Sequence, residues 1–479
     1  MTTKGKFASR HSTQPQSSIT KDVTKLREKA DLETDLLDIE EEFSVKTKSS
    51  LESVTTNKEV EKISKANIFN AVCLVVGTAI GGGFLALPSA VLPIGFYPSF
   101  VALFGIWGYL LALSYTTVES IVKLHEEKKN KSLSQREATS STGLLAVSSS
   151  VFGRKTNIIV ASMMICLLNS ILVIQISRVG LLFPTNYRLA TVTAVMSLSA
   201  LVFGTDKGIS FASKSNSILT ILFCLSASAL FGTGLQSADW TRLSATGSME
   251  WGKIPSAIPV LLYTMVYFEI LPTICELLKY KKRPIRIAIF LGSLVIMGLM
   301  VGWSALATAL IQAGSINSID PVAVLLSTPG MVRLPLLSLS VTAILTTMIG
   351  GYLALISSCK DILGNKIESI RDEKLSRKMR MKLGTLITVP SMLVAASSPT
   401  IYLRAIAFSG KYPVLILAGV LPPLIGFLQR VKERSLNENR LDASLASILA
   451  LGSISVTMLA VNIKNDLASI LMKIFNLVA

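Results

Sequence analysis

Long apolar runs alternate with short polar segments over most of the chain. About 20 consecutive apolar residues form a helix long enough to span the roughly 30 Å hydrocarbon core of a bilayer. Eleven such segments lie at approximately 67–92, 96–118, 156–180, 189–204, 216–235, 255–278, 286–311, 334–358, 383–398, 402–427 and 443–462. The pattern therefore predicts an all-α polytopic membrane protein with about eleven transmembrane helices.

A polar N-terminal segment precedes these runs. We expect residues 1–66 to form a polar, disordered tail, residues 67–462 the transmembrane domain and residues 463–479 a short C-terminal segment. The tail begins with Lys, Arg, Ser and Thr and has no acidic residue before Asp22, as in organelle transit peptides. Residues 31–42 are acidic and fit a cytosolic tail better. A plastid or other organelle membrane and the plasma membrane both stay open.

Composition and charge support a membrane protein. Half of the residues are hydrophobic (50%), only 16% are charged, and the mean hydropathy is +0.56. The net charge of +17 would suit a nucleic-acid-binding protein, but the tail is neutral, with 12 basic and 12 acidic residues. Of the 35 basic residues after it, 26 lie in alternate loops, as the positive-inside bias requires when the N-terminus is cytoplasmic. We therefore expect the lipid bilayer, and no nucleic acid, as a partner.

The first apolar segment contains four glycines in seven residues, at positions 77 and 81–83. Each glycine costs about 1 kcal/mol relative to alanine inside a helix, so the pattern predicts that this helix opens. Open backbone at membrane depth must line a cavity or be buried in protein, where its N–H and C=O groups can bind a ligand. Close helix packing through small residues is the alternative interpretation.

The sixth apolar segment is interrupted by Pro255, Pro259 and Pro272, and Glu269 lies deep within it. An ionisable group at that depth indicates a functional site, with a structural, hydrogen-bonded carboxyl as the alternative. Segments one and six are five helices apart. This spacing predicts a five-plus-five inverted repeat with broken helices 1 and 6, as in alternating-access transporters.

Several motifs resemble the aromatic amino acid permease family, which contains the tryptophan/tyrosine permeases. The first two segments of that family resemble GTAIGGGFLALP at 77–88 and the following residues 95–98. Weaker matches follow in the same order at 259–262, 271–272, 405–410 and 421–422. The resemblance covers about residues 67–462 and implies the leucine-transporter-like fold of the amino acid/polyamine/organocation superfamily.

The resemblance also implies a site in which the break of helix 1 binds the carboxylate and ammonium of an amino acid, opposite the break of helix 6. The implied substrate-binding residues are Gly77, Thr78, Ala79, Ile80, Gly81, Gly82, Gly83, Thr264, Met265, Val266, Tyr267, Phe268 and Glu269. Bacterial members usually carry Gly-Phe-His where this chain has residues 266–269. The carboxylate of Glu269 leaves three alternatives open: an aromatic substrate, a cationic substrate, or a coupling proton on Glu269 itself.

Several residues are candidates for coupling transport to the driving ion. By resemblance, Thr346 and Thr347 occupy the place of a Thr-Ser pair that would hold sodium against the first break. Lys214, near the cytoplasmic end of segment five, or Glu269 would serve proton coupling instead. Threonines also back-bond within membrane helices and terminal lysines snorkel, so structural roles stay open. We expect an ion-driven amino acid symporter, with protons as the first choice of ion and sodium as the alternative.

Other functional classes lack the necessary residues. We expect no enzyme and no cofactor, because the two histidines, His11 and His125, lie outside the apolar segments and no phosphate-binding loop is present. A non-transporting amino acid receptor on the same fold stays open. Arg178 is interpreted as an interfacial anchor at the outer rim, and Trp303 as a packing residue in the core or against lipid.

Overall fold

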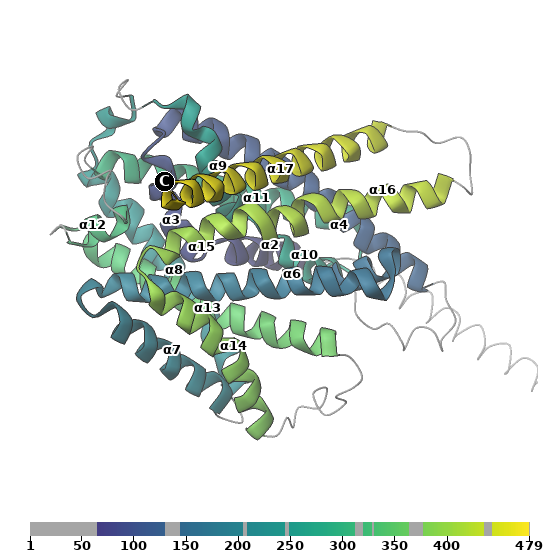
Figure 1. The fold of residues 1–479 in the computed structure, drawn as a ribbon, viewed down its shortest axis with the longest axis horizontal. Coiled ribbons are helices and arrows are strands. Elements are labelled where there is room, and N and C mark those ends of the chain that lie inside the picture. Colours follow the sequence, from purple (N-terminus) through teal and green to yellow (C-terminus); the bar gives the residue numbers. More distant parts are fainter. Residues whose placement is uncertain are drawn as a thin grey trace, which may run out of the picture. The chain divides into compact units, whose positions relative to one another are not determined.

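The computed structural model describes residues 65–129, 144–204, 208–244, 249–311, 320–327, 330–363, 377–434 and 443–478. Regular structure in these ranges is helical, and many of the long helices run roughly parallel or antiparallel to one another (Figure 1). The all-α prediction is therefore confirmed for this part of the chain. The predicted tail lies almost entirely outside it.

The helices of the first half are α2 (Lys65–Ala79), α3 (Gly82–Val91), α4 (Phe96–Lys129), α6 (Leu144–Leu182), α7 (Tyr187–Gly204) and α8 (Gly208–Ser237). Those of the second half are α9 (Ile254–Met265), α10 (Leu271–Leu277), α11 (Lys282–Leu310), α12 (Pro321–Ser327), α13 (Arg333–Leu363), α14 (Arg377–Ser397), α15 (Ile401–Ser409), α16 (Leu421–Arg434) and α17 (Ala443–Val478). Short 3-10 turns are η1 (Pro184–Asn186), η2 (Trp240–Ser244), η4 (Trp251–Lys253) and η5 (Phe268–Ile270), and η8 (Gly410–Val420) is a π-helical segment.

Every predicted apolar segment coincides with a helix or with consecutive helices. Within the described residues, 8 stretches are long and apolar enough to cross a membrane, and the bent pair α2 and α3 raises the number to 9. The predicted segments 189–204 and 383–398 lie in α7 and α14. The apolar part of α14 is shorter than the stretches counted as long enough to cross a membrane. The number of eleven spans stays a prediction. Helix α17 continues to Val478 and so includes most of the expected C-terminal segment.

The helices pack in two groups, each with two spans from each predicted repeat. In the bundle group, α2 and α3 pack against α11, and α9 packs against α3 and α4. In the scaffold group, α6 packs against α7, α13 and α14, and α14 also packs against α7. Helix α8 lies against α13, and α15 lies against α6 and α9. This arrangement is the one expected of an inverted-repeat transporter.

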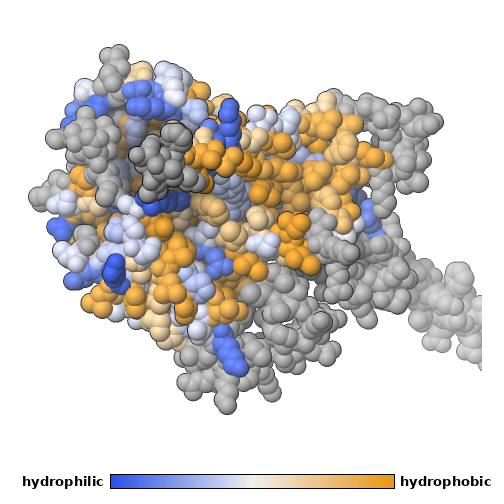
Figure 2. Space-filling model, in the orientation of Figure 1, coloured by the Kyte–Doolittle hydropathy of each residue, from blue (hydrophilic) through white to orange (hydrophobic). Residues whose placement is uncertain are grey.

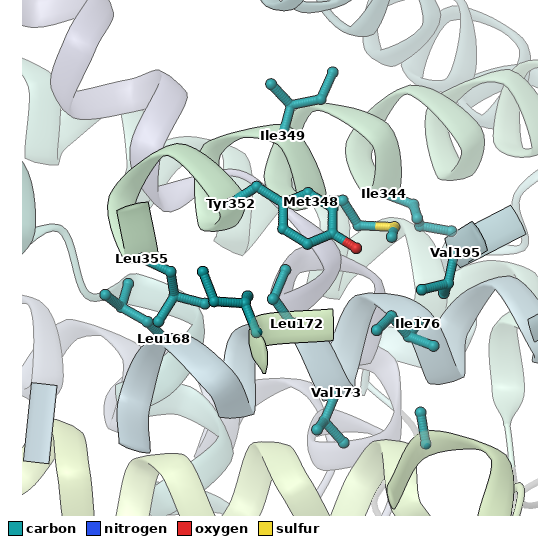
Figure 3. Close-up of a cluster of buried hydrophobic side chains, with 12 residues drawn as sticks. Leu168, Leu172, Val173, Ile176, Val195, Ile344, Met348, Ile349, Tyr352 and Leu355 are labelled. Carbon is teal, nitrogen blue, oxygen red and sulfur yellow. The ribbon is translucent and has the colours of Figure 1, made fainter. Parts of the chain in front are cut away.

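A cluster of buried side chains holds the scaffold group together (Figure 3). It contains Leu168, Leu172, Val173 and Ile176 of α6, Val195 of α7, Ile344, Met348, Ile349, Tyr352 and Leu355 of α13, and Ile387 and Ala395 of α14. The Ser199 hydroxyl of α7 lies 2.9 Å from the Tyr352 hydroxyl and 3.2 Å from the Thr388 hydroxyl, which links three helices. Because lipid is as apolar as these side chains, close packing and interhelical hydrogen bonds stabilise the cluster.

The outer surface of the helices is apolar. Figure 2 shows hydrophobic side chains over the region of α16 and α17. Along α17 alone, exposed large apolar side chains include Leu449, Ile454, Val456, Val461, Ile463, Leu467, Ile470, Leu471 and Met472. Such a continuous apolar surface is far larger than the patches of soluble proteins and suits contact with lipid chains.

Pro88 removes one hydrogen bond from α3, because it has no N–H to donate to the carbonyl oxygen of Phe84 four residues earlier. The indole N–H of Trp303 in α11 donates to that oxygen instead, at 3.0 Å. The two rings also stack, with centroids 5.5 Å apart. Trp303 is fully buried, which confirms its expected packing role. It fixes α3 to α11 just beyond the glycine cluster.

Gly292 allows α11 to approach α2 closely. A Cβ atom added at Gly292 would lie 2.6 Å from the Cβ atom of Val75, which belongs to α2. A Cβ atom added at Gly298, about two turns further along α11, would meet no atom within 4 Å. Of these two glycines, Gly292 is the one that acts as a small residue at a helix interface.

We expect Gly292→Ala to lower the midpoint of thermal unfolding of the purified protein in detergent, because overpacking of this kind costs about 1–3 kcal/mol. Gly298→Ala on the same helix is the matched control and should unfold as the parent protein does. Equal midpoints for the two variants would contradict the close contact between α11 and α2.

We expect Trp303→Phe to destabilise the protein by about 1–3 kcal/mol, since it leaves the buried Phe84 carbonyl without a donor. Adding Pro88→Ala should recover part of this loss, because alanine supplies the missing helical N–H. Thermal unfolding of both single variants and the double variant measures the coupling. If Pro88→Ala has the same effect with and without Trp303, the carbonyl does not depend on the indole.

Candidate functional site

The first span is broken at Ile80 and Gly81. Helix α2 ends at Ala79, α3 begins at Gly82, and the two are bent by 59°. Gly81 is extended (φ −149°, ψ −152°), and its carbonyl oxygen accepts the N–H of Phe84 at 3.0 Å. The break lies within the predicted range 77–83 but is shorter than expected.

The expectation that 77–83 is unwound is wrong for Gly77, Thr78 and Ala79, which belong to α2, and for Gly82 and Gly83, which begin α3. The Thr78 hydroxyl donates to the carbonyl of Leu74 at 2.8 Å, within the helix. One isolated glycine costs less than the backbone hydrogen bonds that opening would sacrifice in a bilayer. Only the consecutive glycines 81–83 concentrate enough of this cost to end α2.

The sixth span is broken at Val266 and Tyr267. Helix α9 ends at Met265, Val266 is extended (φ −75°, ψ 136°), and Tyr267 has φ −141° and ψ 18°. The turn η5 and helix α10 follow. Thr264 and Met265 form the last turn of α9, and Glu269 lies in η5. The predicted break is thus confirmed, in the middle of the predicted residues 264–269.

The half-helices on either side of the breaks meet in pairs. Helices α3 and α9 form one pair, since a Cβ added at Gly83 would lie 3.0 Å from the Tyr263 ring and 3.4 Å from the Thr264 Cα. Helix α2 contacts η5 and α10. Each break therefore brings the N-terminus of one half-helix and the C-terminus of another to the same depth.

The free helix ends carry opposite partial charges. The N-termini of α3 and η5 present N–H groups, whereas the C-termini of α2 and α9 present C=O groups. The first turn of α3 has no acidic residue, but the first turn of η5 contains Glu269. A carboxylate group of a ligand is therefore favoured at α3, and an ammonium group at the carbonyl ends or near Glu269.

Thr347 of α13 lies directly against the first break. A Cβ atom added at Gly81 would overlap the Thr347 hydroxyl oxygen. That hydroxyl donates to the Ala343 carbonyl at 2.7 Å, and the Thr346 hydroxyl donates to the Thr342 carbonyl at 2.9 Å. Both threonines therefore back-bond to their own helix, while the oxygen of Thr347 also faces Gly81.

The structure describes the side chain of Glu269 but not that of Lys214. Glu269 is partly buried at the second break, and none of the ion pairs among the described residues involves it. The side chain of Lys214 lies outside the described part of α8. A role for Glu269 in coupling thus keeps geometric support, and the role of Lys214 stays a prediction.

Aromatic side chains surround both breaks. Tyr263 of α9, Tyr267 in the break and Phe268 of η5 are buried. On the other side, Phe84 stacks on Trp303 and lies edge-on to Phe223 of α8, with centroids 6.5 Å apart. Aromatic surroundings suit an aromatic ligand, since ring pairs gain more than their buried area alone provides.

Two ion pairs between distant parts of the chain, the first buried and the second partly exposed, were missed by the sequence analysis. Arg178 is fully buried and pairs with Asp320, so its interpretation as an interfacial anchor is wrong. Lys411 of η8 pairs with Asp466 of α17 at 2.5 Å, and the Tyr412 hydroxyl donates to the same carboxylate at 2.7 Å. A charged residue inside an apolar run was the available signal for Arg178, but its partner lies 142 positions away.

Comparison with known proteins agrees with this geometry. The profile of the tryptophan/tyrosine permease family matches residues 64–461. Tyrosine-specific transport system 1 of Haemophilus influenzae is 22% identical over 356 residues, a match that covers 71% of this chain and 82% of that protein. The crystal structure of MhsT in complex with L-phenylalanine is similar with a TM-score of 0.50 at 13% identity, covering 84% of this chain and 98% of MhsT.

The likeness to MhsT concerns the fold, and it confirms the predicted leucine-transporter-like arrangement with broken helices 1 and 6. The family profile extends over nearly the whole membrane domain. It includes both breaks and the motifs around them. The chain therefore belongs to the tryptophan/tyrosine permease family.

Proposed function

We propose that the protein is a proton-coupled symporter of an aromatic amino acid, with tyrosine as the first substrate to test. Membership of a permease family makes the chain a transporter of the amino acid class rather than an enzyme. The name of the bacterial relative suggests tyrosine, and the aromatic residues around the breaks suit its ring. Alternating access follows from the bundle and scaffold groups, which rock against each other around a site at the breaks.

The observation that carries the proposal is the asymmetry of the two broken helices. The N-terminus of α3 has no acidic side chain, so it attracts the substrate carboxylate. The N-terminus of η5 already holds Glu269, whose carboxyl can take up and release a proton beside the substrate. One break therefore serves substrate binding and the other serves coupling.

Sodium coupling is the second candidate, and one contact favours it. The Thr347 hydroxyl oxygen faces Gly81 while its hydrogen is directed to the Ala343 carbonyl. Such an oxygen keeps a lone pair for a cation, and carbonyl oxygens of the first break lie nearby. Uptake that requires sodium and is lost in Thr347→Val would favour this candidate over protons.

We expect Gly81→Ala to lower the uptake of radiolabelled tyrosine into proteoliposomes at least about tenfold, since a loss of roughly 1.4 kcal/mol in binding suffices. The added Cβ would displace the Thr347 side chain from the first break. Gly77→Ala in the same motif is the matched control, because its Cβ meets no atom within 4 Å. Uptake that falls equally in both variants would contradict a site at Gly81.

We expect Glu269→Gln to abolish accumulation driven by an acidic outside pH, while exchange of labelled for unlabelled tyrosine continues. The neutral amide cannot take up and release a proton as a carboxyl group does, but exchange of substrate needs no net proton movement. Glu276→Gln on α10, an exposed residue two turns away, is the control and should keep the parent pH dependence. A pH gradient that still drives Glu269→Gln would remove this carboxyl from coupling.

A further inference from the structure

A buried ion pair joins α6 to the segment before α12. Arg178 is 0% exposed and Asp320 only 8% exposed. Arg178 Nη1 donates to Asp320 Oδ2, and the other carboxylate oxygen, Oδ1, accepts the N–H of Val322 at 3.1 Å. The guanidinium carbon lies 5.2 Å from the centroid of the Tyr402 ring on α15. One carboxylate thus binds the guanidinium and caps α12 at the same time.

The pair lies at the boundary between the two helix groups. Arg178 belongs to α6 of the scaffold group, whereas Asp320 begins α12, which contacts both α3 and α13. Leu325 of α12 packs against a buried cluster formed by Leu92, Ala307 and Ile311, which belong to or follow α3 and α11 of the bundle group. The ion pair therefore ties α12, which packs on both groups and through Leu325 on the bundle, to a helix of the scaffold.

The predicted topology places this pair on the outer side. With a cytoplasmic N-terminus, the end of α6 and the segment between α11 and α13 both face outward. The Arg178 guanidinium lies over the ring of Tyr402, which is buried on α15. Helix α15 packs against α9, the half-helix that ends at the second break. The ion pair is thus connected through α15 to the candidate substrate site.

We propose that Arg178 and Asp320 are the residues that close the outer access to the substrate site. The inference rests on the proposed transport function. In the closed form, the ion pair holds α12 against α6 and α15. Opening moves the bundle group away from the scaffold group, so it separates the two charges and lets water reach both.

The pair is suited to reversible closure. Among the described residues, Arg178 Nε and Nη2 have no acceptor, and neither atom of the Gln175 amide one turn earlier has a partner. Buried donors without partners oppose the closed form, because water would satisfy them in the open form. The attraction between the two charges outweighs this cost only while both remain together. Loss of one charge should therefore favour opening.

The substitution Asp320→Asn removes the negative charge of this residue but keeps its role as the helix cap of α12. Asparagine caps a helix as well as aspartate does, so α12 keeps its N-terminus while the ion pair is lost. Thr264→Cys, in a background whose five cysteines are replaced, supplies a buried reporter at the last turn of α9. The experiment measures how fast a membrane-impermeant maleimide, added outside intact bacterial cells, labels this reporter.

Asp239→Asn is the matched control. Asp239 lies in the outer segment between α8 and α9, where one carboxylate oxygen accepts the N–H of Thr241 and the other pairs with Arg242 at 3.1 Å. The hydrogen bond from the Thr241 hydroxyl lowers the pKa of Asp239, so the control pair is ionised at neutral pH. It is exposed, however, and holds no helix groups together.

We expect Asp320→Asn to raise the labelling rate at least about tenfold. The labelling rate follows the fraction of protein in the open form, so this corresponds to a tenfold larger open fraction. Asp239→Asn should stay within about twofold of the parent rate, as expected of an exposed pair. The double variant Arg178→Gln with Asp320→Asn also lacks the ion pair but leaves no unpaired buried charge, so it should label faster than the parent and no faster than the single variant.

Labelling of Asp320→Asn or of the double variant at the control rate would overturn the gate. If the single variant does not fold, the double variant alone decides. Labelling needs no substrate, so a protein that transports no tyrosine can still show the gate, and a protein that transports tyrosine can still lack it. The two proposals therefore fail separately.

Discussion

Backbone hydrogen bonding is the constraint on which the structure depends. A bilayer core offers no water to an unpaired N–H or C=O group, so each span continues as a helix wherever it faces lipid. The chain interrupts this rule at Ile80–Gly81 and at Val266–Tyr267, where α3 meets α9 and α2 meets η5. The breaks are tolerated because protein surrounds them, and their free backbone groups are what a zwitterionic substrate needs.

The same constraint explains the surroundings of the first break. Pro88 withholds a donor from the Phe84 carbonyl, and the Trp303 indole supplies one from α11. Close contacts at Gly81 and Gly83 then place α3 against Thr347 and Tyr263. A helix end that must keep unpaired groups for a ligand is thus fixed by side chains from three other helices. Its position comes from these contacts and not from its own hydrogen bonds.

Much of the fold could be predicted from the sequence, because apolar runs, glycine clusters and prolines act locally. The runs located the helices, the glycine cluster at 77–83 located the first break, and the prolines of the sixth segment indicated the second. The length of the first break could not be predicted, since Thr78 back-bonds and keeps α2 helical to Ala79. Helix propensity ranks how strongly each residue favours a helix. The bilayer determines how many backbone hydrogen bonds the chain can lose.

Contacts between residues far apart in the chain could not be predicted from the sequence. Arg178 resembles an interfacial anchor until Asp320 is placed beside it, and the hydrogen bond from Trp303 to the Phe84 carbonyl is not visible in the sequence around either residue. Both partners lie more than a hundred positions away, and no periodicity connects them. These distant pairs are also the contacts that join one helix to another. Sequence patterns therefore predict the spans better than they predict how the spans hold together.

Charged side chains at and between the helices divide into two kinds, paired and unpaired. Arg178 with Asp320 and Lys411 with Asp466 are paired, and each pair connects two elements that are distant in sequence. A paired charge keeps its protonation state because its partner stabilises the ionised form. Glu269 has no ion-pair partner among the described residues and lies at a helix N-terminus beside the proposed substrate site. Paired charges can therefore maintain a conformation, while this unpaired carboxyl can gain or lose a proton as the conformation changes.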